Sequence, residues 1–100
     1  MRYLTLMAEY TQSALRDDFL GPVTPEEVGL SWALGDRIRD WNERYRFVVP
    51  LGPDKRTMSA TANLIASLDE EGLSLVEEIA SVLSDAKVRY YSEGHLRYLR

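Results

Sequence analysis

The last third of the chain constrains the fold more than any other part. Residues 68–79 are predicted to form an amphipathic helix, which runs almost directly into residues 87–91. These five residues, Lys-Val-Arg-Tyr-Tyr, favour a strand because β-branched and aromatic side chains fit a pleated sheet. A Ser92-Glu93-Gly94 turn then leads to a second strand over residues 96–99. A helix followed by a strand pair is half of a two-layer α/β domain.

Alternating side chains predict a strand at the other end of the chain. Residues 2–10 alternate with a period of two, and both rows carry large groups, so we expect a central strand there. A short second strand is predicted over residues 13–16. An edge strand is predicted over residues 47–49, where Pro50 marks its end. Residues 50–58 contain two prolines and a glycine and are expected to form an exposed loop.

Capping residues and apolar spacing predict two main helices. Thr24-Pro25-Glu26-Glu27 is typical of a helix start, but Gly29 follows at once. We therefore expect a single turn over residues 25–28 and a main helix from residue 32 to about residue 46. The second helix is predicted from about residue 60 to Ser84-Asp85-Ala86. Gly72 lies on its buried stripe, which predicts a close approach to a neighbouring element.

These elements predict one α+β domain over residues 1–100. The expected architecture is a two-layer sandwich, with the two main helices on one face of a small, mostly antiparallel sheet. The predicted core consists of the apolar stripes of both layers: Tyr3, Leu4, Leu6, Leu34, Ile38, Trp41, Tyr45, Ile65, Leu68, Leu75, Ile79, Val82, Val88 and Tyr90.

Composition excludes several classes of function. The chain has no cysteine and one histidine, and the acidic run over residues 69–71 lacks the ligand spacing of a calcium loop, so we expect no metal and no cofactor. The net charge of −4 disfavours a dedicated nucleic-acid binder. Residues 1–9 are too short and too interrupted for a signal peptide or a membrane span. The sequence therefore predicts a cytoplasmic protein with no membrane partner.

Charge is distributed unevenly along the chain. Residues 69–78 hold five carboxylates and no base, whereas residues 87–100 hold Lys87, Arg89, Arg97 and Arg100 against only Glu93. We interpret this contrast as intramolecular complementarity between the acidic helix and the basic end of the chain.

Trp32 is the strongest candidate for a partner contact. A helix advances about 100° per residue, which places Trp32 opposite the apolar stripe of its own helix. Its neighbours on this outer face are predicted to be Gly35, Asp36, Arg39 and Glu43. Tryptophan beside arginine is the composition of an interface hot spot. The alternative is that Trp32, in the first helical turn, folds back onto Val28 and Leu30.

A second candidate surface lies at the C-terminal hairpin. It consists of the polar and aromatic residues Arg89, Tyr91, Glu93, His95 and Arg97. Beside Arg89 and Glu93, His95 could line a polar pocket for a ligand or a reaction. With Tyr98, the same strands could instead stack nucleic-acid bases. The run Ser92-Glu93-Gly94-His95 is not interpreted as a catalytic triad, because adjacent turn residues point in divergent directions.

Several short motifs resemble a group of small uncharacterised bacterial α/β proteins. They are Ser13-Ala14-Leu15-Arg16-Asp17, Gly29-Leu30-Ser31, Trp41-Asn42-Glu43-Arg44-Tyr45, residues 68–75 and Val88-Arg89-Tyr90-Tyr91. The resemblance covers most of the chain and implies an α/β fold, but it carries no activity over to this sequence.

The leading functional hypothesis is a non-catalytic protein-binding module. It would self-associate as a homodimer or bind one protein partner, for example as an immunity- or antitoxin-like inhibitor, by analogy with small acidic α/β proteins that act beside secreted toxins. The alternatives are a small ligand-binding protein or enzyme with a polar pocket at the C-terminal hairpin, and a nucleic-acid binder that uses the basic C-terminal strands.

Overall fold

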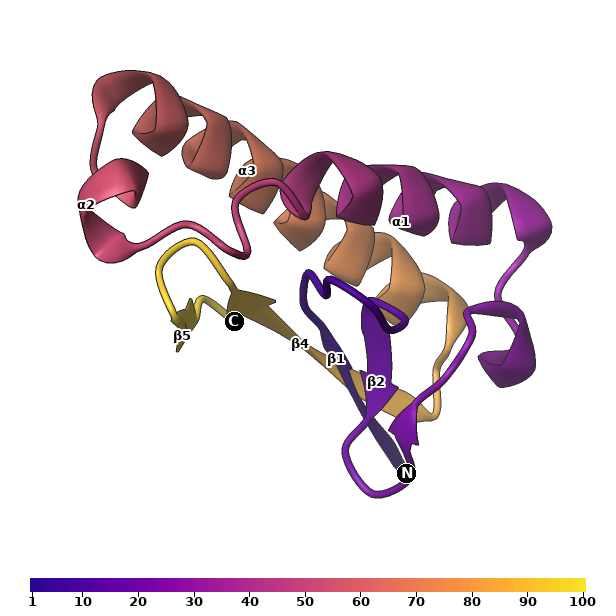
Figure 1. Cartoon of the computed structure of the whole chain (residues 1–100). Coiled ribbons are helices and arrows are strands. Elements are labelled where there is room, and N and C mark those ends of the chain that lie inside the picture. The colour runs from indigo at the N-terminus through magenta and orange to yellow at the C-terminus, as the bar shows by residue number, and fades with distance from the viewer.

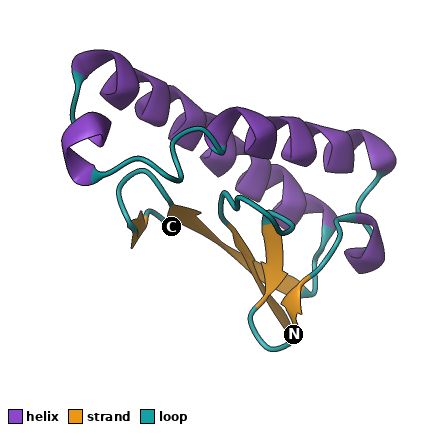
Figure 2. Cartoon of the chain, viewed as in Figure 1, coloured by secondary structure: helices purple, strands orange, loops and turns teal.

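The computed structural model describes residues 1–100 and has two layers, a twisted sheet and a group of helices (Figure 1). All helices lie on the same side of the strands, so the opposite face of the sheet has no helix over it (Figure 2). In chain order the elements are β1 (Arg2–Leu6), β2 (Leu15–Asp17), β3 (Gly21–Pro22), the 3-10 turn η1 (Glu26–Val28), α1 (Trp32–Tyr45), α2 (Pro53–Arg56), α3 (Ser59–Val82), β4 (Ala86–Ser92) and β5 (Arg97–Tyr98). The predicted α+β sandwich is confirmed.

The sheet is mixed, with its one parallel pair at the centre. The strand order is β3-β2-β1-β4-β5. β1 and β4 are parallel, with Leu6 opposite Tyr90, and the other three pairings are antiparallel. Parallel neighbours need a long crossover, and here both main helices lie within it. Because three of the four pairings are antiparallel, the prediction of a mostly antiparallel sheet is confirmed.

Local capping fixes the start of α1 as the sequence predicts. Thr24 and Glu27 exchange hydrogen bonds, because each side chain accepts from the other residue's backbone N–H. The short turn then ends at Gly29, whose φ of 98° suits a residue without a Cβ. Ser31 begins the main helix by accepting a hydrogen bond from the Leu34 N–H at 3.1 Å.

The close approach predicted at Gly72 is also confirmed. A Cβ at Gly72 would lie 2.3 Å from Cε1 of Tyr90. The missing side chain therefore lets Tyr90 of β4 fit directly against α3. Beside it, Trp41 of α1 is fully buried, and its indole N–H donates to the Leu68 carbonyl of α3 at 2.8 Å.

Three predicted boundaries are wrong. The first strand ends at Leu6 rather than at residue 10, because no strand lies beside residues 8–10 to pair with them. Residues 47–49 are not an edge strand but form turns after α1, with local hydrogen bonds such as Val48 N–H to Tyr45 O. The predicted loop over residues 50–58 contains the helical turn α2, which begins at Pro53.

Most of the predicted core is buried, with three exceptions. Tyr3 is exposed because it points to the sheet face away from the helices, and Val82 is exposed in the last turn of α3. Val88 is half-buried and packs against the edge of the core. None of the helices combines the length and the apolar composition that crossing a bilayer requires.

Candidate functional site

Trp32 lies on the surface, as the helical spacing of α1 predicts. Its side chain is 72% exposed, so it does not fold back onto Val28 and Leu30, which are themselves buried. The guanidinium carbon of Arg39 lies 6.0 Å from the centre of the Trp32 ring, two turns further along α1. This distance is at the limit of a cation–π contact. An exposed indole and an arginine therefore share one face of the helix.

The Arg39 side chain is fixed by two carboxylates. It forms a bidentate pair with Glu26 of η1, at 3.0 and 2.9 Å, and a further hydrogen bond with Asp36 at 2.8 Å. Hydrogen bonding from Arg39 lowers the pKa of Glu26, and the two carboxylates raise the pKa of Arg39. The cation beside Trp32 is thus already held in place before any partner arrives.

Gly35 does not belong to the exposed surface, which corrects its predicted place beside Trp32. It is buried, and a Cβ at this position would lie 2.0 Å from Oε2 of Glu26. The glycine therefore leaves room for the Glu26–Arg39 pair to lie against α1. Asp36, Arg39 and Glu43 are exposed as predicted.

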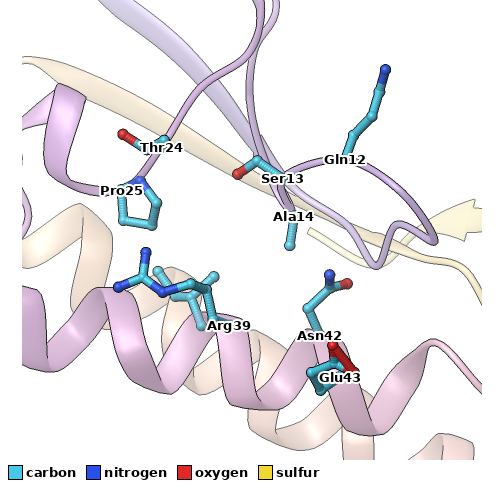
Figure 3. A pocket seen from close by; sticks show the side chains of 9 residues that line it. Gln12, Ser13, Ala14, Thr24, Pro25, Arg39, Asn42 and Glu43 are labelled. Atoms are coloured by element: carbon cyan, nitrogen blue, oxygen red, sulfur yellow. The ribbon is translucent and has the colours of Figure 1, made fainter.

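Two adjoining pockets follow the same side of α1. The first, of about 300 Å³, lies between α1 and the segments around residues 12–14 and 24–25, and Arg39, Asn42 and Glu43 border it (Figure 3). The second, of about 360 Å³, shares Glu43 and is lined also by Tyr10, Arg46, Phe47 and Pro50. The sequence analysis missed Phe47, which is 76% exposed, because it assigned this residue to a strand.

Asp69 of α3 is a second polar centre, at the core between the layers. Its carboxylate accepts hydrogen bonds from Tyr45 of α1 at 2.8 Å and from Tyr90 of β4 at 2.6 Å. Ser92 of β4 donates to the other carboxylate oxygen at 2.7 Å. Burial is the main cause that raises the pKa of Tyr45 to about 12, and it raises the pKa of Tyr90 as well. Three elements are therefore joined through one buried carboxylate.

The residues of the predicted C-terminal surface do not gather at one site. Arg89 and Tyr91 alternate with the buried Tyr90 and so point to the uncovered face of the sheet. His95 lies on the hairpin, with Nε2 3.8 Å from Asp69, and Arg97 is exposed in β5. The prediction that Arg89 and His95 border one pocket is therefore wrong, because the sheet separates them.

Glu93 belongs neither with Arg89 and Tyr91 on the uncovered sheet face nor with His95 on the hairpin. Arg56 of α2 donates to the backbone carbonyls of Val49, Leu51 and Glu93, and its guanidinium lies 3.9 Å from the Glu93 carboxylate. Burial raises the pKa of Glu93. His95 does border a pocket of about 290 Å³, but its other neighbours come from residues 51–57 and from Gly94 and Leu96.

The acidic helix is neutralised mainly by α1. Arg37 pairs with Glu78 at 2.6 Å and Arg44 with Glu71 at 2.7 Å, whereas the basic C-terminal segment contributes only Arg100, 3.5 Å from Glu77. The predicted complementarity within the chain is present, but most of it joins the two helices rather than the helix and the C-terminal strands.

A family model matches residues 2–93, which is almost the whole chain, and its description is Serratia CdiI immunity protein-like. The chain belongs to this immunity protein family. Its members are binding inhibitors of a CDI toxin and are typically non-enzymatic. The predicted class, a non-catalytic protein-binding module of the immunity type, is therefore confirmed by the family. A comparison with curated proteins gives no match.

The Ser92-Glu93-Gly94-His95 run is not arranged as a nucleophile with its base. Ser92, the nucleophile type in the run Ser92-Glu93-Gly94-His95, is fully buried, and its hydroxyl is engaged with Asp69 and with the His95 N–H. No three histidine or acidic side chains lie together as metal ligands would. The exposed aromatic and arginine side chains of α1 have the composition of a surface that binds a protein.

Proposed function

We propose that this chain neutralises its cognate CdiA toxin domain in the cytoplasm by forming a stoichiometric complex with it. The proposed contact surface, which we call the α1 face, is Trp32, Asp36, Arg39 and Glu43 with the adjoining pockets. The observation that carries this choice is the 72% exposure of Trp32 beside an arginine held by two carboxylates. Tryptophan and arginine dominate the binding energy of protein interfaces when a partner covers them.

Preorganisation supports this surface. Ordering a flexible side chain at an interface costs about 0.5–1.5 kcal/mol, and Arg39 is already fixed by Glu26 and Asp36 before binding. The first pocket beside it is bordered by polar side chains such as Gln12, Asn42 and Glu43, which can hydrogen-bond to side chains of a partner. An apolar anchor with a polar rim is the usual anatomy of a specific interface.

The test is a Trp32→Glu variant titrated with the purified toxin domain in a calorimeter. A lost hot spot of about 2 kcal/mol or more weakens binding by at least about 30-fold. Leu64→Glu is the matched control, because it puts the same charge at an exposed apolar position of α3. Thermal unfolding of both variants is expected to match the wild type, since neither residue is part of the core.

Two results would contradict this proposal. If the wild-type chain and the toxin domain form no complex, inhibition by binding is wrong for this pair. If Trp32→Glu instead converts a dimer of this chain to monomers in light scattering and leaves toxin binding unchanged, the α1 face serves self-association.

A further inference from the structure

The uncovered face of the sheet carries a row of cations. Leu4, Leu6 and Tyr90 are buried toward the helices, so the alternating positions of the same strands point away from them. The register places Thr5 of β1 between Arg16 of β2 and Arg89 of β4. Lys87 lies on the same face two residues before Arg89. This basic sheet face, consisting of Arg16, Lys87 and Arg89 with the aromatic residues around them, crosses the three central strands.

These cations differ from the others in having no carboxylate partner. Seven of the twelve lysines and arginines form ion pairs, and all seven lie on the helices, directly after α1, on the first residue of β1 or at the C-terminal residue. The five without an ion pair are Arg16, Lys55, Lys87, Arg89 and Arg97, four of which lie in strands. The acid nearest to this row, Asp18, is hydrogen-bonded to the Thr5 hydroxyl at 2.8 Å.

Aromatic rings lie among these cations. Arg89 lies over the Tyr98 ring, 3.6 Å from its centre, and Tyr98 in turn meets Tyr91 edge to face at 5.1 Å. Toward the β2–β3 end of the face, Tyr3 and the highly exposed Phe19 form a second edge-to-face pair at 6.0 Å. Tyrosine, phenylalanine and arginine are enriched in protein interfaces, and here they share one surface.

Electrostatics gives this face a preferred partner. Neighbouring strands are about 4.8 Å apart, so Arg16 and Arg89 repel each other across β1. Asp18, which is hydrogen-bonded to Thr5 between them, offsets only part of this repulsion, because one carboxylate faces three cations. A partner surface with carboxylates would relieve it, and it would also be attracted from a distance before contact. The basic face is thus complementary to an acidic surface, although the whole chain carries a net charge of −4.

We propose that the basic sheet face docks a carboxylate-rich surface of the toxin domain. This inference rests on the proposed function and adds the chemistry of the partner. A protein is favoured over a nucleic acid because Tyr98 is covered by Arg89 and meets Tyr91 in an edge-to-face pair, whereas sheet-based RNA readers stack bases on free ring faces. The net negative charge of the chain also repels a long polyanion.

Charge reversal with binding kinetics tests this proposal. Arg16→Glu/Arg89→Glu is compared with wild type for association with the purified toxin domain, at salt concentrations from about 0.05 to 0.5 M, across which the screening length falls several-fold. We expect at least a 10-fold slower association at low salt and a flatter salt dependence. Lys55→Glu is the control, since it reverses an equally unpaired, exposed cation on α2. Lys87→Glu serves as a milder second variant if the double variant unfolds.

The outcomes separate this inference from the proposed function. If both sheet variants associate with the toxin domain as the wild type does, while Trp32→Glu weakens binding, the basic sheet face is not the docking surface and toxin binding stands. If the wild type does not bind, the proposed function itself fails. If polyuridylate binds the wild type but not the sheet variants, and toxin association is unchanged, the face is a nucleic-acid surface and the protein-docking proposal is overturned.

Discussion

On the sheet face that the helices cover, the buried carboxylate of Asp69 is paired with hydroxyl groups, whereas on the opposite face cations are exposed and have no ion pair. Asp69 accepts three hydroxyl hydrogen bonds from α1 and β4 between the layers. Arg16 and Arg89, on the uncovered face of the same sheet, form no ion pair with a carboxylate. A buried polar group must find its partners within the fold, because leaving it unpaired costs about 1–3 kcal/mol.

The difference separates residues that specify the fold from residues available to a partner. Removing a group from the Asp69 cluster leaves other buried groups without a hydrogen bond. Removing a cation from the outer face leaves only water where the charge was. Substitutions in the Asp69 cluster should therefore lower the free energy of unfolding more than substitutions on the outer face. Substitutions on the outer face should weaken binding to a partner more than substitutions in the cluster.

The largest expected effect is that of Asp69→Ala. The substitution leaves the hydroxyls of Tyr45, Tyr90 and Ser92 without their acceptor in a buried site, so the free energy of unfolding should fall by about 3 kcal/mol or more. Asp69→Asn keeps an acceptor oxygen, so its free energy of unfolding should fall by clearly less than that of Asp69→Ala. Urea denaturation measures both variants. If Asp69→Ala is as stable as the wild type, the cluster does not hold the layers together.

An intermediate effect is expected from alkaline pH. Burial raises the pKa of Tyr45 to about 12 in the folded chain, above its ordinary value near 10, and that of Tyr90 shifts in the same direction. The stability that these protonated hydroxyls contribute is fully present below pH 10. It is lost as the pH rises toward 12, because the unfolded chain releases these protons first. Unfolding midpoints measured from pH 9 to 12 should decline, and Tyr45→Phe should reduce the decline.

The smallest effect on stability is expected at the outer face. Arg89→Ala removes an exposed cation from the Tyr98 ring, and such contacts contribute about 0.5–1 kcal/mol. A double-mutant cycle with Tyr98→Phe and Tyr98→Ala isolates this contact in the same denaturation assay. A loss as large as that of Asp69→Ala would mean that the two faces do not differ in the way described here.

Local signals predicted much of this architecture. The capping residues Thr24 and Ser31 and the apolar spacing of α1 and α3 depend on neighbours in the sequence, so the helix starts and the buried stripes could be inferred. The turns over residues 47–49 were predicted as a strand from their composition, because composition does not show whether a free sheet edge lies beside a segment. Tyr3 was assigned to the core because alternation alone does not say which face of a sheet the helices cover.

The candidate sites were less accessible to sequence reasoning. Exposure of Trp32 follows from the helical period, but burial of Gly35 depends on Glu26, which reaches it from another element. The Asp69 cluster was missed because its donors lie 21–24 residues away along the chain. A signal was present: Asp69 shares the three- and four-residue spacing of Ile65, Gly72 and Val76, and a carboxylate on a buried stripe needs donors from neighbouring elements.

The parallel pairing of β1 with β4 has a consequence for how the protein is made. Residues 2–6 leave the ribosome about eighty residues before their central partner, residues 86–90. Until then the earliest strand has only the short β2 beside it, and closing so distant a pairing is slow. Newly synthesised chains therefore complete the central pairing of the sheet only after β4 has emerged, and a truncated product that lacks β4 would leave β1 without this partner.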